Sequence, residues 1–292
     1  MTPTAASVGR LVVCPTPIGN VDDVTLRVLD ALRHADVVAC EDTRHTGLLL
    51  ARHGIAARLL SFHEHNERAR SRELLDRVRA GAVVALVSDA GTPLVCDPGF
   101  ALVQGCLQAG LALEVLPGPS AVLTALLASG LPAERWRFVG FLPRRRAELL
   151  ELLGGAGETL VAFESPRRLA ATLALLAEHD PTRAVAVCRE LTKLHEEVRR
   201  GSAAELAEHY REVPARGEVV LVVGAGSAGE GDSRRLGEAV AALRELVDAG
   251  AKPRAAAAVV ARLTDLGANA LYRELTQARS TGSRGPDEPS TR

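Results

Sequence analysis

Several features that define particular protein classes are scarce or missing in this chain. Only 3% of its 292 residues are aromatic, so its core must be built from alanine, valine and leucine. The five cysteines are an odd number without a C-x-x-C pair, which disfavours a disulfide framework or a zinc site. The longest apolar runs, such as residues 255–261, fall far short of the roughly 18 residues of a membrane span. No signal pattern is found near Met1, so we expect a cytoplasmic protein with no membrane partner.

An excess of charge of either sign is lacking too. The formal net charge is -1, so no global field draws the chain to polyanions, and nucleic-acid binding must depend on local patches. Lysine occurs only at Lys193 and Lys252, and nearly all positive charge is arginine. Together with abundant alanine this pattern is typical of GC-rich coding sequence, so arginine clusters are weak evidence for RNA binding and a retained lysine is informative.

Short apolar runs alternate with helical periodicity along most of the chain, which predicts an α/β fold. The runs are continuous rather than alternating, so the sheet of the first half should be mainly parallel and covered on both faces. Expected strands are residues 10–14, 36–39, 58–62, 82–88, 112–116, 136–140, 159–163, 184–188 and 218–223. We expect α/β domains over 8–130 and 131–224, a glycine-rich linker over 225–233, a small helical domain over 234–279 and a disordered tail over 280–292. The helical domain is either a helix-turn-helix unit or a plain helical cap.

The most informative segment is residues 88–99, Ser-Asp-Ala-Gly-Thr-Pro-Leu-Val-Cys-Asp-Pro-Gly, which directly follows the apolar run 82–87. Open α/β sheets bind ligands outside the carboxyl ends of their strands, so this polar loop is a candidate site. After the first strand, residues 15–20 hold only Gly19 of the three glycines that a G-x-G-x-x-G fingerprint requires. A dinucleotide-dependent oxidoreductase is therefore disfavoured, and the expected ligand has no pyrophosphate.

Eight motifs in register carry a resemblance to a known family. They are residues 15–20 with Asp23 and Thr25, and residues 41–44, 61–67, 88–99, 117–121, 138–143, 163–168 and 189–197. In this order they resemble the ribosomal RNA small subunit methyltransferase I (RsmI) family of the tetrapyrrole-methylase superfamily, over about residues 10–223, and the tail through Tyr272 resembles the family's helical domain. One departure is Arg167, where the family pattern has histidine, so no imidazole role carries over to this position.

The resemblance implies two α/β domains of the tetrapyrrole-methylase (class III methyltransferase) type with a small C-terminal helical domain. It also implies S-adenosylmethionine as cofactor, in a cleft between the α/β domains, and a homodimer. The implied reaction is 2′-O-methylation of a cytidine in the decoding centre of 16S rRNA, within the small ribosomal subunit. Two other functions remain open: a tetrapyrrole (precorrin-type) C-methyltransferase, and a non-catalytic factor that binds the small subunit.

S-adenosylmethionine requires backbone donors and acceptors with a few carboxylates rather than a phosphate-binding loop. Gly91 and Gly118 are expected to let the backbone approach the ligand, and Ser120 to cap the following helix. The expected cofactor-binding residues are Pro17, Gly19, Asn20, Asp89, Ala90, Gly91, Thr92, Pro93, Ser120, Ala121, Phe163 and Leu191.

The expected catalytic residues are Lys193, Asp42 and Arg44. Burial and a neighbouring sulfonium would lower the pKa of Lys193 toward that of a base, although a phosphate-binding role is equally compatible with the sequence. Asp42 and Arg44 either orient the ribose or form a structural ion pair. Glu196 and Glu197 either assist Lys193 or lie on a solvated helix face.

Residues 63–67, His-Glu-His-Asn-Glu, have the composition of a metal site but not the separated elements from which zinc ligands usually come. Because methyl transfer from S-adenosylmethionine requires no metal, we expect none and assign this segment to RNA contact. The expected RNA-binding residues are His63, His65, Arg145, Arg167 and Arg168.

Overall fold

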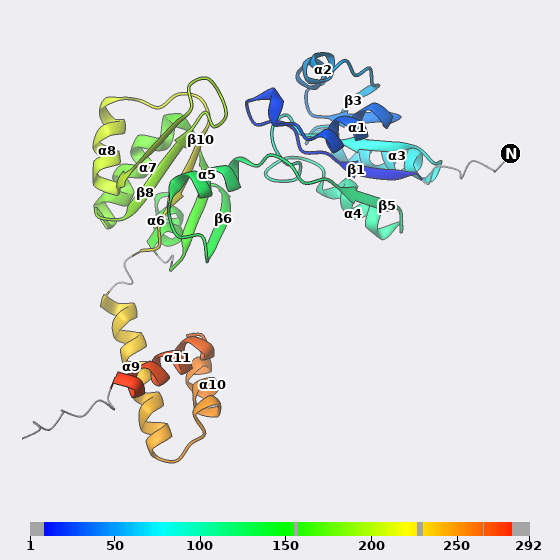
Figure 1. Ribbon diagram of the computed structural model, residues 1–292. Helices are drawn as coiled ribbons and strands as arrows, with labels where there is room; N and C mark the ends of the chain where they lie inside the picture. Colours follow the sequence, from blue (N-terminus) through cyan, green and yellow to red (C-terminus); the bar gives the residue numbers. More distant parts are fainter. Residues whose placement is uncertain (1–8, 155–156, 227–229, 265, 282–292) are drawn as a thin grey trace, which may run out of the picture. The chain divides into compact units, whose positions relative to one another are not determined.

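The computed structural model describes residues 9–154, 157–226, 230–264 and 266–281 of the chain (Figure 1). The chain divides into two compact units, and the first ends at Gly226. This first unit contains two lobes, each built on a five-stranded sheet, and the second unit is helical. The α/β class expected from the sequence is confirmed.

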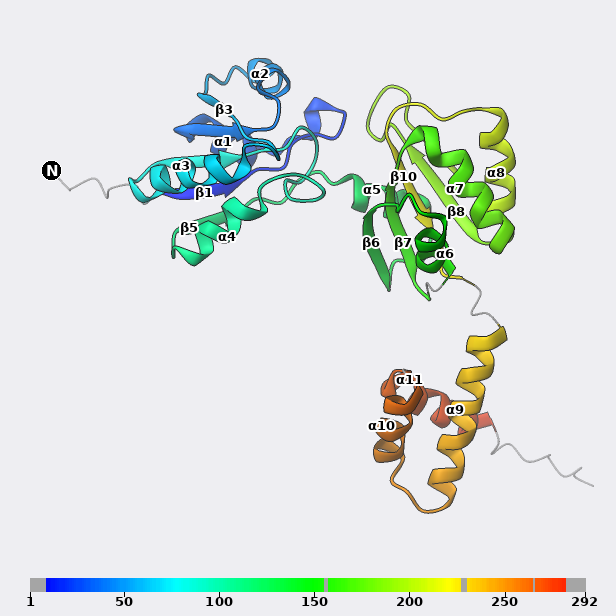
Figure 2. The same ribbon diagram turned by 180° about the vertical axis from the view of Figure 1, so that it is seen from behind.

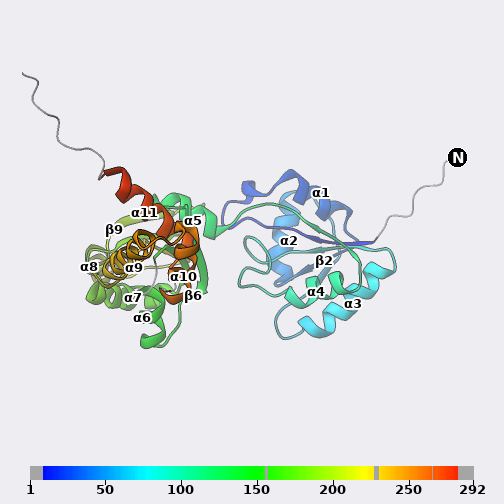
Figure 3. The ribbon, with the colours of Figure 1, turned by 90° about the horizontal axis from the view of Figure 1, so that it is seen from below.

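The first lobe is built on a parallel sheet with the strand order β3-β2-β4-β1-β5. The strands are β1 (Arg10–Val13), β2 (Val37–Cys40), β3 (Leu59–Ser61), β4 (Val83–Leu86) and β5 (Ala112–Val115). The helices are α1 (Leu26–His34), α2 (Thr43–Arg52), α3 (Glu67–Arg79) and α4 (Phe100–Gln108), with a 3-10 turn at Val21–Asp23. Figure 3 shows α1 on one face of this sheet and α3 with α4 on the other.

Strand β4 shows why these apolar runs are continuous. Val83 and Ala85 pack into the core beneath α1, whereas Val84 and Leu86 pack into the core beneath α3 and α4. Because successive side chains point to opposite faces and both faces are buried, every position of the strand is apolar. All five strands run in one direction, so the loops that follow β1, β4 and β5 meet at one edge of the sheet.

The second lobe has a mixed sheet with the strand order β6-β7-β10-β8-β9, and Figure 2 shows β6 beside β7. Its strands are β6 (Trp136–Phe141), β7 (Thr159–Glu164), β8 (Ala184–Arg189), β9 (Glu197–Ser202) and β10 (Val219–Val223), and only β6 and β7 pair in parallel. Its helices are α5 (Ala121–Ser129), α6 (Arg146–Gly154), α7 (Pro166–His179) and α8 (Ala203–Glu212). Helix α5 packs against β8 and β10 although it precedes the expected boundary at residue 130.

Strand β9 corrects one expectation from the sequence. Glu197 does not lie on a helix face, because it begins β9 and pairs with Arg189 of β8, and the two side chains form an ion pair of 3.1 Å. The strand has the sequence Glu-Val-Arg-Arg-Gly-Ser and lies at the edge of the sheet. Charged side chains are common on edge strands, where they discourage pairing with other chains, so the apolar pattern of a buried strand is absent here.

The helical unit consists of α9 (Glu230–Asp248), α10 (Pro253–Thr264) and α11 (Ala268–Thr281). Its core contains Leu243, Val260 and Leu271. Helix α9 begins inside the segment 225–233 that was expected to be a linker, and α11 continues to Thr281, into the expected tail. The remaining tail residues, 282–292, lie outside the described residues. No helix within the described ranges is long and apolar enough to cross a bilayer.

Candidate active site

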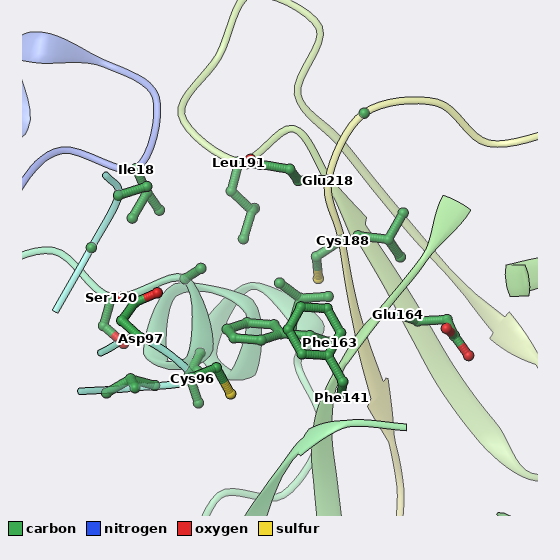
Figure 4. Close-up of a pocket in the computed structure, with 18 of the residues that line it drawn as sticks. Ile18, Cys96, Asp97, Ser120, Phe141, Phe163, Glu164, Cys188, Leu191 and Glu218 are labelled. Atoms are coloured by element: carbon green, nitrogen blue, oxygen red, sulfur yellow. The ribbon is translucent and has the colours of Figure 1, made fainter. Parts of the chain in front are cut away.

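The first unit contains a cavity of about 390 Å³. Its walls come from the strand-end loops of the first lobe and from α5, β6, β7, β8 and β10 of the second (Figure 4). The residues lining the cavity are Ile18, Ala90, Gly91, Thr92, Val95, Cys96, Asp97, Ser120, Ala121, Val122, Phe141, Phe163, Glu164, Ser165, Pro166, Cys188, Leu191, Gly217, Glu218, Val219 and Val220.

The lining is largely apolar and contains acidic but no cationic side chains. The ring of Phe163 lies between those of Phe138 and Phe141, at centroid distances of 5.0 and 5.4 Å. In the view of Figure 4, Asp97 and Ser120 lie at one side of the cavity and the rings of Phe141 and Phe163 at the other. A phosphate-bearing ligand would find no countercharge here, whereas a neutral or cationic ligand with an aromatic part fits this donor set.

The loop between β4 and α4 is fixed by hydrogen bonds to neighbouring loops. The backbones of Thr16 and Gly91 exchange two hydrogen bonds, with N to O distances of 2.8 and 3.0 Å. The Thr92 hydroxyl donates to the carbonyl of Pro119 at 3.0 Å. Leu94 and Cys96 have φ angles of 71° and 66° in the left-handed region, which costs energy for non-glycine residues. The loop is therefore held in one strained conformation against the cavity.

Three carboxylates gather near the carboxyl ends of β2 and β4. Burial, together with the charges of Glu41 and Asp89, raises the pKa of Asp97 to about 6, although a hydrogen bond from Ser88 opposes this. Burial and the charge of Asp89 also raise the pKa of Glu41, while His63 opposes the change. No group of three histidine, cysteine or acidic residues within the described ranges is arranged to hold a metal ion.

Seven of the expected cofactor-binding residues line the cavity, and five do not. Those in the lining are Ala90, Gly91, Thr92, Ser120, Ala121, Phe163 and Leu191, and those outside it are Pro17, Gly19, Asn20, Asp89 and Pro93. Asp89 instead accepts a hydrogen bond of 3.0 Å from the backbone N–H of Asp42, which ties the loop after β4 to the start of α2.

Gly91 and Gly118 were both expected to let the backbone approach the ligand, and the structure separates the two. Gly91 lines the cavity with a φ of +77°. Gly118 does not line it, and a Cβ atom at this position would lie 2.6 Å from the Cβ atom of Pro15. Gly118 therefore allows the loops after β1 and β5 to pack together rather than to approach a ligand. Ser120 caps α5 as expected, accepting a hydrogen bond of 3.4 Å from the N–H of Leu123.

Gly19 and Asn20 contact the loop that follows β8. The N–H of Asn20 donates to the Thr192 hydroxyl at 2.9 Å. A Cβ atom on Gly19 would lie 2.5 Å from Cγ of Lys193 and 2.9 Å from the carbonyl oxygen of Leu191. The first-strand loop thus packs against residues 190–193 and fixes the segment that places Leu191 in the cavity.

The expected lowering of the Lys193 pKa is wrong for this structure. The Lys193 ammonium lies 2.9 Å from a carboxylate oxygen of Glu190 and 2.9 Å from one of Glu218. Burial alone would lower the pKa of Lys193, but the hydrogen bonds and charges of Glu218 and Glu190 outweigh burial and raise it. Lys193 is therefore an ammonium that holds together residues distant in sequence, and it is not prepared to accept a proton.

Asp42 is the N-cap of α2, and its carboxylate accepts a hydrogen bond of 2.8 Å from the N–H of Arg44. The guanidinium of Arg44 is 93% exposed and lies 3.9 Å from the same carboxylate oxygen. Asp42 therefore caps a helix, and the ion pair with Arg44, which the sequence left open as the structural alternative, is present but long and exposed. Arg44 remains accessible to a macromolecular substrate.

The expected RNA-binding residues differ in how accessible they are. Arg145, Arg167 and His65 are exposed. Arg168 donates to the carbonyls of Leu142 and Pro143 at 3.0 and 2.6 Å, so both of its terminal nitrogens already donate within the lobe. His63 is partly buried, and its Nε2 atom lies 3.1 Å from the side-chain nitrogen of Asn66.

Sequence reasoning missed several residues of the cavity. Asp97 lies in the polar segment 88–99 and Phe141 in the motif 138–143, so membership of these motifs is the sequence signal for both. Ile18 lies between the expected residues Pro17 and Gly19, and its apolar side chain is the signal that marks it as part of the lining. No signal in the sequence indicated Glu218, because its position depends on the pairing of β10 with β8.

Glu164 is a buried carboxylate in the wall of the cavity, and replacing it measures its contribution to the free energy of unfolding. Its carboxylate accepts hydrogen bonds from the Thr172 hydroxyl at 2.6 Å and the Ser165 N–H at 2.7 Å, and lies 3.4 Å from Arg168. Glu164→Leu should lower the free energy of unfolding by about 3 kcal/mol, because it leaves these donors without their acceptor. Denaturant unfolding followed by circular dichroism measures this change.

The matched control is Glu178→Leu, which removes an exposed ion pair with Arg146 of 2.7 Å. Exposed pairs contribute less than about 1 kcal/mol, so this variant should unfold almost as the unmodified chain does. Equal effects of the two substitutions would contradict a special role for the buried carboxylate.

Comparison with known proteins agrees with this architecture. The family of Tetrapyrrole (Corrin/Porphyrin) Methylases matches residues 10–207, which include both sheets except β10. A uroporphyrin-III C-methyltransferase from Thermus thermophilus, solved in complex with S-adenyl homocysteine, is 24% identical with a TM-score of 0.52, over 74% of this chain and 97% of that one. The family match places the chain in the class of tetrapyrrole methylases, and the solved structure shares its fold.

Curated relatives narrow this class to one family. The ribosomal RNA small subunit methyltransferase I of Micromonospora olivasterospora is 45% identical over 94% of this chain and 88% of its own length. The protein of the same name from Escherichia coli O157:H7 is 42% identical over 91% of this chain and 94% of its own length. The chain belongs to the ribosomal RNA small subunit methyltransferase I family, and it is a methyltransferase.

Proposed function

We propose that this chain transfers a methyl group from S-adenosylmethionine to the 2′-hydroxyl of a cytidine in the decoding centre of 16S rRNA. The observation that carries the proposal is the match to relatives named small-subunit rRNA methyltransferases along both the α/β lobes and the helical unit. Because the chain has a net charge of -1, we infer that its substrate is the assembled small subunit, which offers shape as well as phosphate charge. Ribosomes are assembled in the cytoplasm, where the protein would act.

The donor set of the cavity fits S-adenosylmethionine. The apolar side chains of Ile18, Phe163 and Leu191 suit an adenine ring and its ribose, and a lining without cationic side chains suits a ligand that carries a sulfonium. The first N–H groups of α5, at Ala121 and Val122, have no acceptor within the helix and border the cavity, so they can receive a carboxylate. The Thermus thermophilus enzyme of this fold was solved with S-adenyl homocysteine, a close chemical relative of this cofactor.

When bound, the cofactor supplies an electrophilic methyl group on a sulfonium. The protein's part is to hold this group in line with the ribose oxygen and to exclude water, and accurate positioning accounts for much of such catalysis. The aromatic cluster around Phe163 and the side chain of Leu191 provide the water-excluding walls. We propose Lys193 as the cation that fixes the loop bearing Leu191, and Arg44 as a contact for the RNA backbone.

Exposed cations are proposed to position the RNA. Arg145, Arg167 and His65 are accessible at the surface, and together with Arg44 they form the proposed phosphate contacts. Arg168 is proposed to act indirectly, by holding the carbonyls of Leu142 and Pro143.

The chain is proposed to work as a homodimer. Helix α5 presents Leu123 and Leu127 to solvent within the first unit, and these side chains are 49% and 75% exposed. Because contiguous exposed apolar side chains mark protein interfaces, we propose this face of α5 as the contact between the two copies.

The test is transfer of a labelled methyl group from S-adenosylmethionine to unmodified 30S particles and, separately, to free 16S rRNA, followed by nucleoside digestion and mass analysis. The expected product is 2′-O-methylcytidine, formed faster on the particles. Equal rates on both substrates would contradict the assembled subunit as substrate. Transfer to neither, combined with methylation of a macrocyclic tetrapyrrole, would overturn the proposal in favour of C-methylation.

A further inference from the structure

Methylation of a hydroxyl requires a group that accepts its proton, and the cavity contains three carboxylates. That of Glu164 is occupied by Thr172, Ser165 and Arg168, and Figure 4 shows it pointing away from the aromatic rings. That of Glu218 holds the Lys193 ammonium at 2.9 Å. Asp97 lines the cavity, and within the described residues no cation forms an ion pair with it.

We propose that Asp97 is the catalytic base of this reaction, an inference that rests on the proposed function. In the step, a carboxylate oxygen of Asp97 takes the proton of the ribose 2′-hydroxyl as its O–H bond breaks. The 2′-oxygen forms a bond to the methyl carbon while the carbon–sulfur bond breaks, and the bonding electron pair remains on sulfur. The products are the methyl ether, neutral S-adenosylhomocysteine and protonated Asp97, which releases its proton to solvent.

The surroundings of Asp97 suit a general base. Glu41, after β2, and Asp89, after β4, are its charged neighbours, and both disfavour its ionised form. With a pKa of about 6, raised first by burial, Asp97 is ionised at neutral pH yet more basic than an ordinary carboxylate. Across the cavity the second lobe presents Glu164 and Glu218, whose contacts to cations are internal to that lobe.

The backbone fixes where this carboxylate lies. Cys96, directly before Asp97, has a φ of 66°, and Leu94 has a φ of 71°. Strained residues of this kind persist only where the surrounding structure holds them, and they are common at active sites. Pro98 follows Asp97 and restricts its backbone to extended conformations.

The experiment compares the purified chain with Asp97→Asn and Asp97→Glu. Asp97→Asn keeps the size and polarity of the side chain but cannot accept the proton, so the rate of methyl transfer to 30S particles at pH 7.5 should fall about 10²- to 10⁴-fold. Calorimetric affinity for S-adenosylmethionine should stay within about threefold. Asp97→Glu should recover part of the rate. Asp76→Asn, which removes an exposed carboxylate of α3, is the control and should not change the rate.

The pH profile gives the second readout. For the unmodified chain, kcat/KM should rise with pH and level off above an apparent pKa of about 6, because the base must be ionised. The kcat profile should level off at lower pH, since a bound sulfonium favours the ionised carboxylate. In Asp97→Asn, neither kcat/KM nor kcat should show this rise with pH.

Two results would overturn the assignment of Asp97. One is a loss of cofactor affinity in Asp97→Asn that accounts for the whole loss of rate, which would make Asp97 a binding residue. The other is an unchanged rate of methyl transfer in Asp97→Asn. Failure of the proposed function is distinguishable from both, because then the unmodified chain itself transfers no methyl group to the small subunit.

Discussion

Gly91→Val is expected to weaken binding of S-adenosylmethionine at least about 100-fold. Gly91 lies in the wall of the cavity with a φ of +77°, a conformation that β-branched residues strongly disfavour. Its Cβ atom would lie 3.2 Å from Cγ2 of Ile18, so the valine methyl groups extend into space that the ligand requires or push the Thr16 to Gly91 pairing apart. Isothermal titration calorimetry of the folded variant measures the loss.

Gly110→Val is the control for Gly91→Val. It shows how much of the lost cofactor affinity comes from backbone strain alone rather than from a change in the cavity. Gly110 has a φ of +63°, and a Cβ atom there meets nothing within 4 Å. Valine at this position therefore strains the backbone to a similar degree, in the turn between α4 and β5, but leaves the cavity unchanged. Equal losses of cofactor affinity in the two variants would mean that Gly91 acts only through stability.

Gly19→Ala is expected to lower the rate of methyl transfer about 100-fold while the chain stays folded. The added methyl group would lie 2.5 Å from Cγ of Lys193, 2.7 Å from the Thr192 hydroxyl and 2.9 Å from the Leu191 carbonyl. The side chain of Lys193 can move aside, but the Leu191 carbonyl is backbone, so the loop must shift. Leu191 then leaves its place in the cavity wall, and displacements of about 1 Å are sufficient for losses of this size.

The control for Gly19→Ala is Gly157→Ala, where a Cβ atom meets nothing within 4 Å. Single-turnover transfer to 30S particles and denaturant unfolding should be measured for both variants. An unaffected rate in Gly19→Ala would show that the contact between Gly19 and residues 190–193 has no role in the reaction.

The buried strands of this fold could be predicted from the sequence because burial on both faces requires an uninterrupted apolar run. This is the case for β4, where alternate residues pack beneath different helices. The edge strand β9 could not be predicted in the same way, because its Glu-Val-Arg-Arg-Gly-Ser sequence has no apolar face. A strand of this kind is recognised only by its partner, β8.

Several loops that the sequence singled out line the cavity, but the hydrogen bonds and charges of their side chains depend on residues that are distant in the chain. The ammonium of Lys193 is held by Glu218, 25 residues later, and by Glu190, and together these contacts reverse the pKa shift that burial alone would produce. Asp89 accepts a hydrogen bond from the backbone N–H of Asp42, 47 residues away, a contact that its local sequence does not indicate. Local sequence shows that a loop is polar, whereas only the assembled strands show which donor each carboxylate meets.

The most direct test of the methyl-transfer site is the methylation of small-subunit rRNA in cells that lack this protein. Nucleoside digestion and fragment mass analysis should show one cytidine of the decoding centre without its 2′-O-methyl group. The unmodified chain should restore the methyl group, Gly110→Val should restore it as well, and Gly91→Val should not. Full methylation at this cytidine in the absence of the protein would contradict the assignment of the cavity to this reaction.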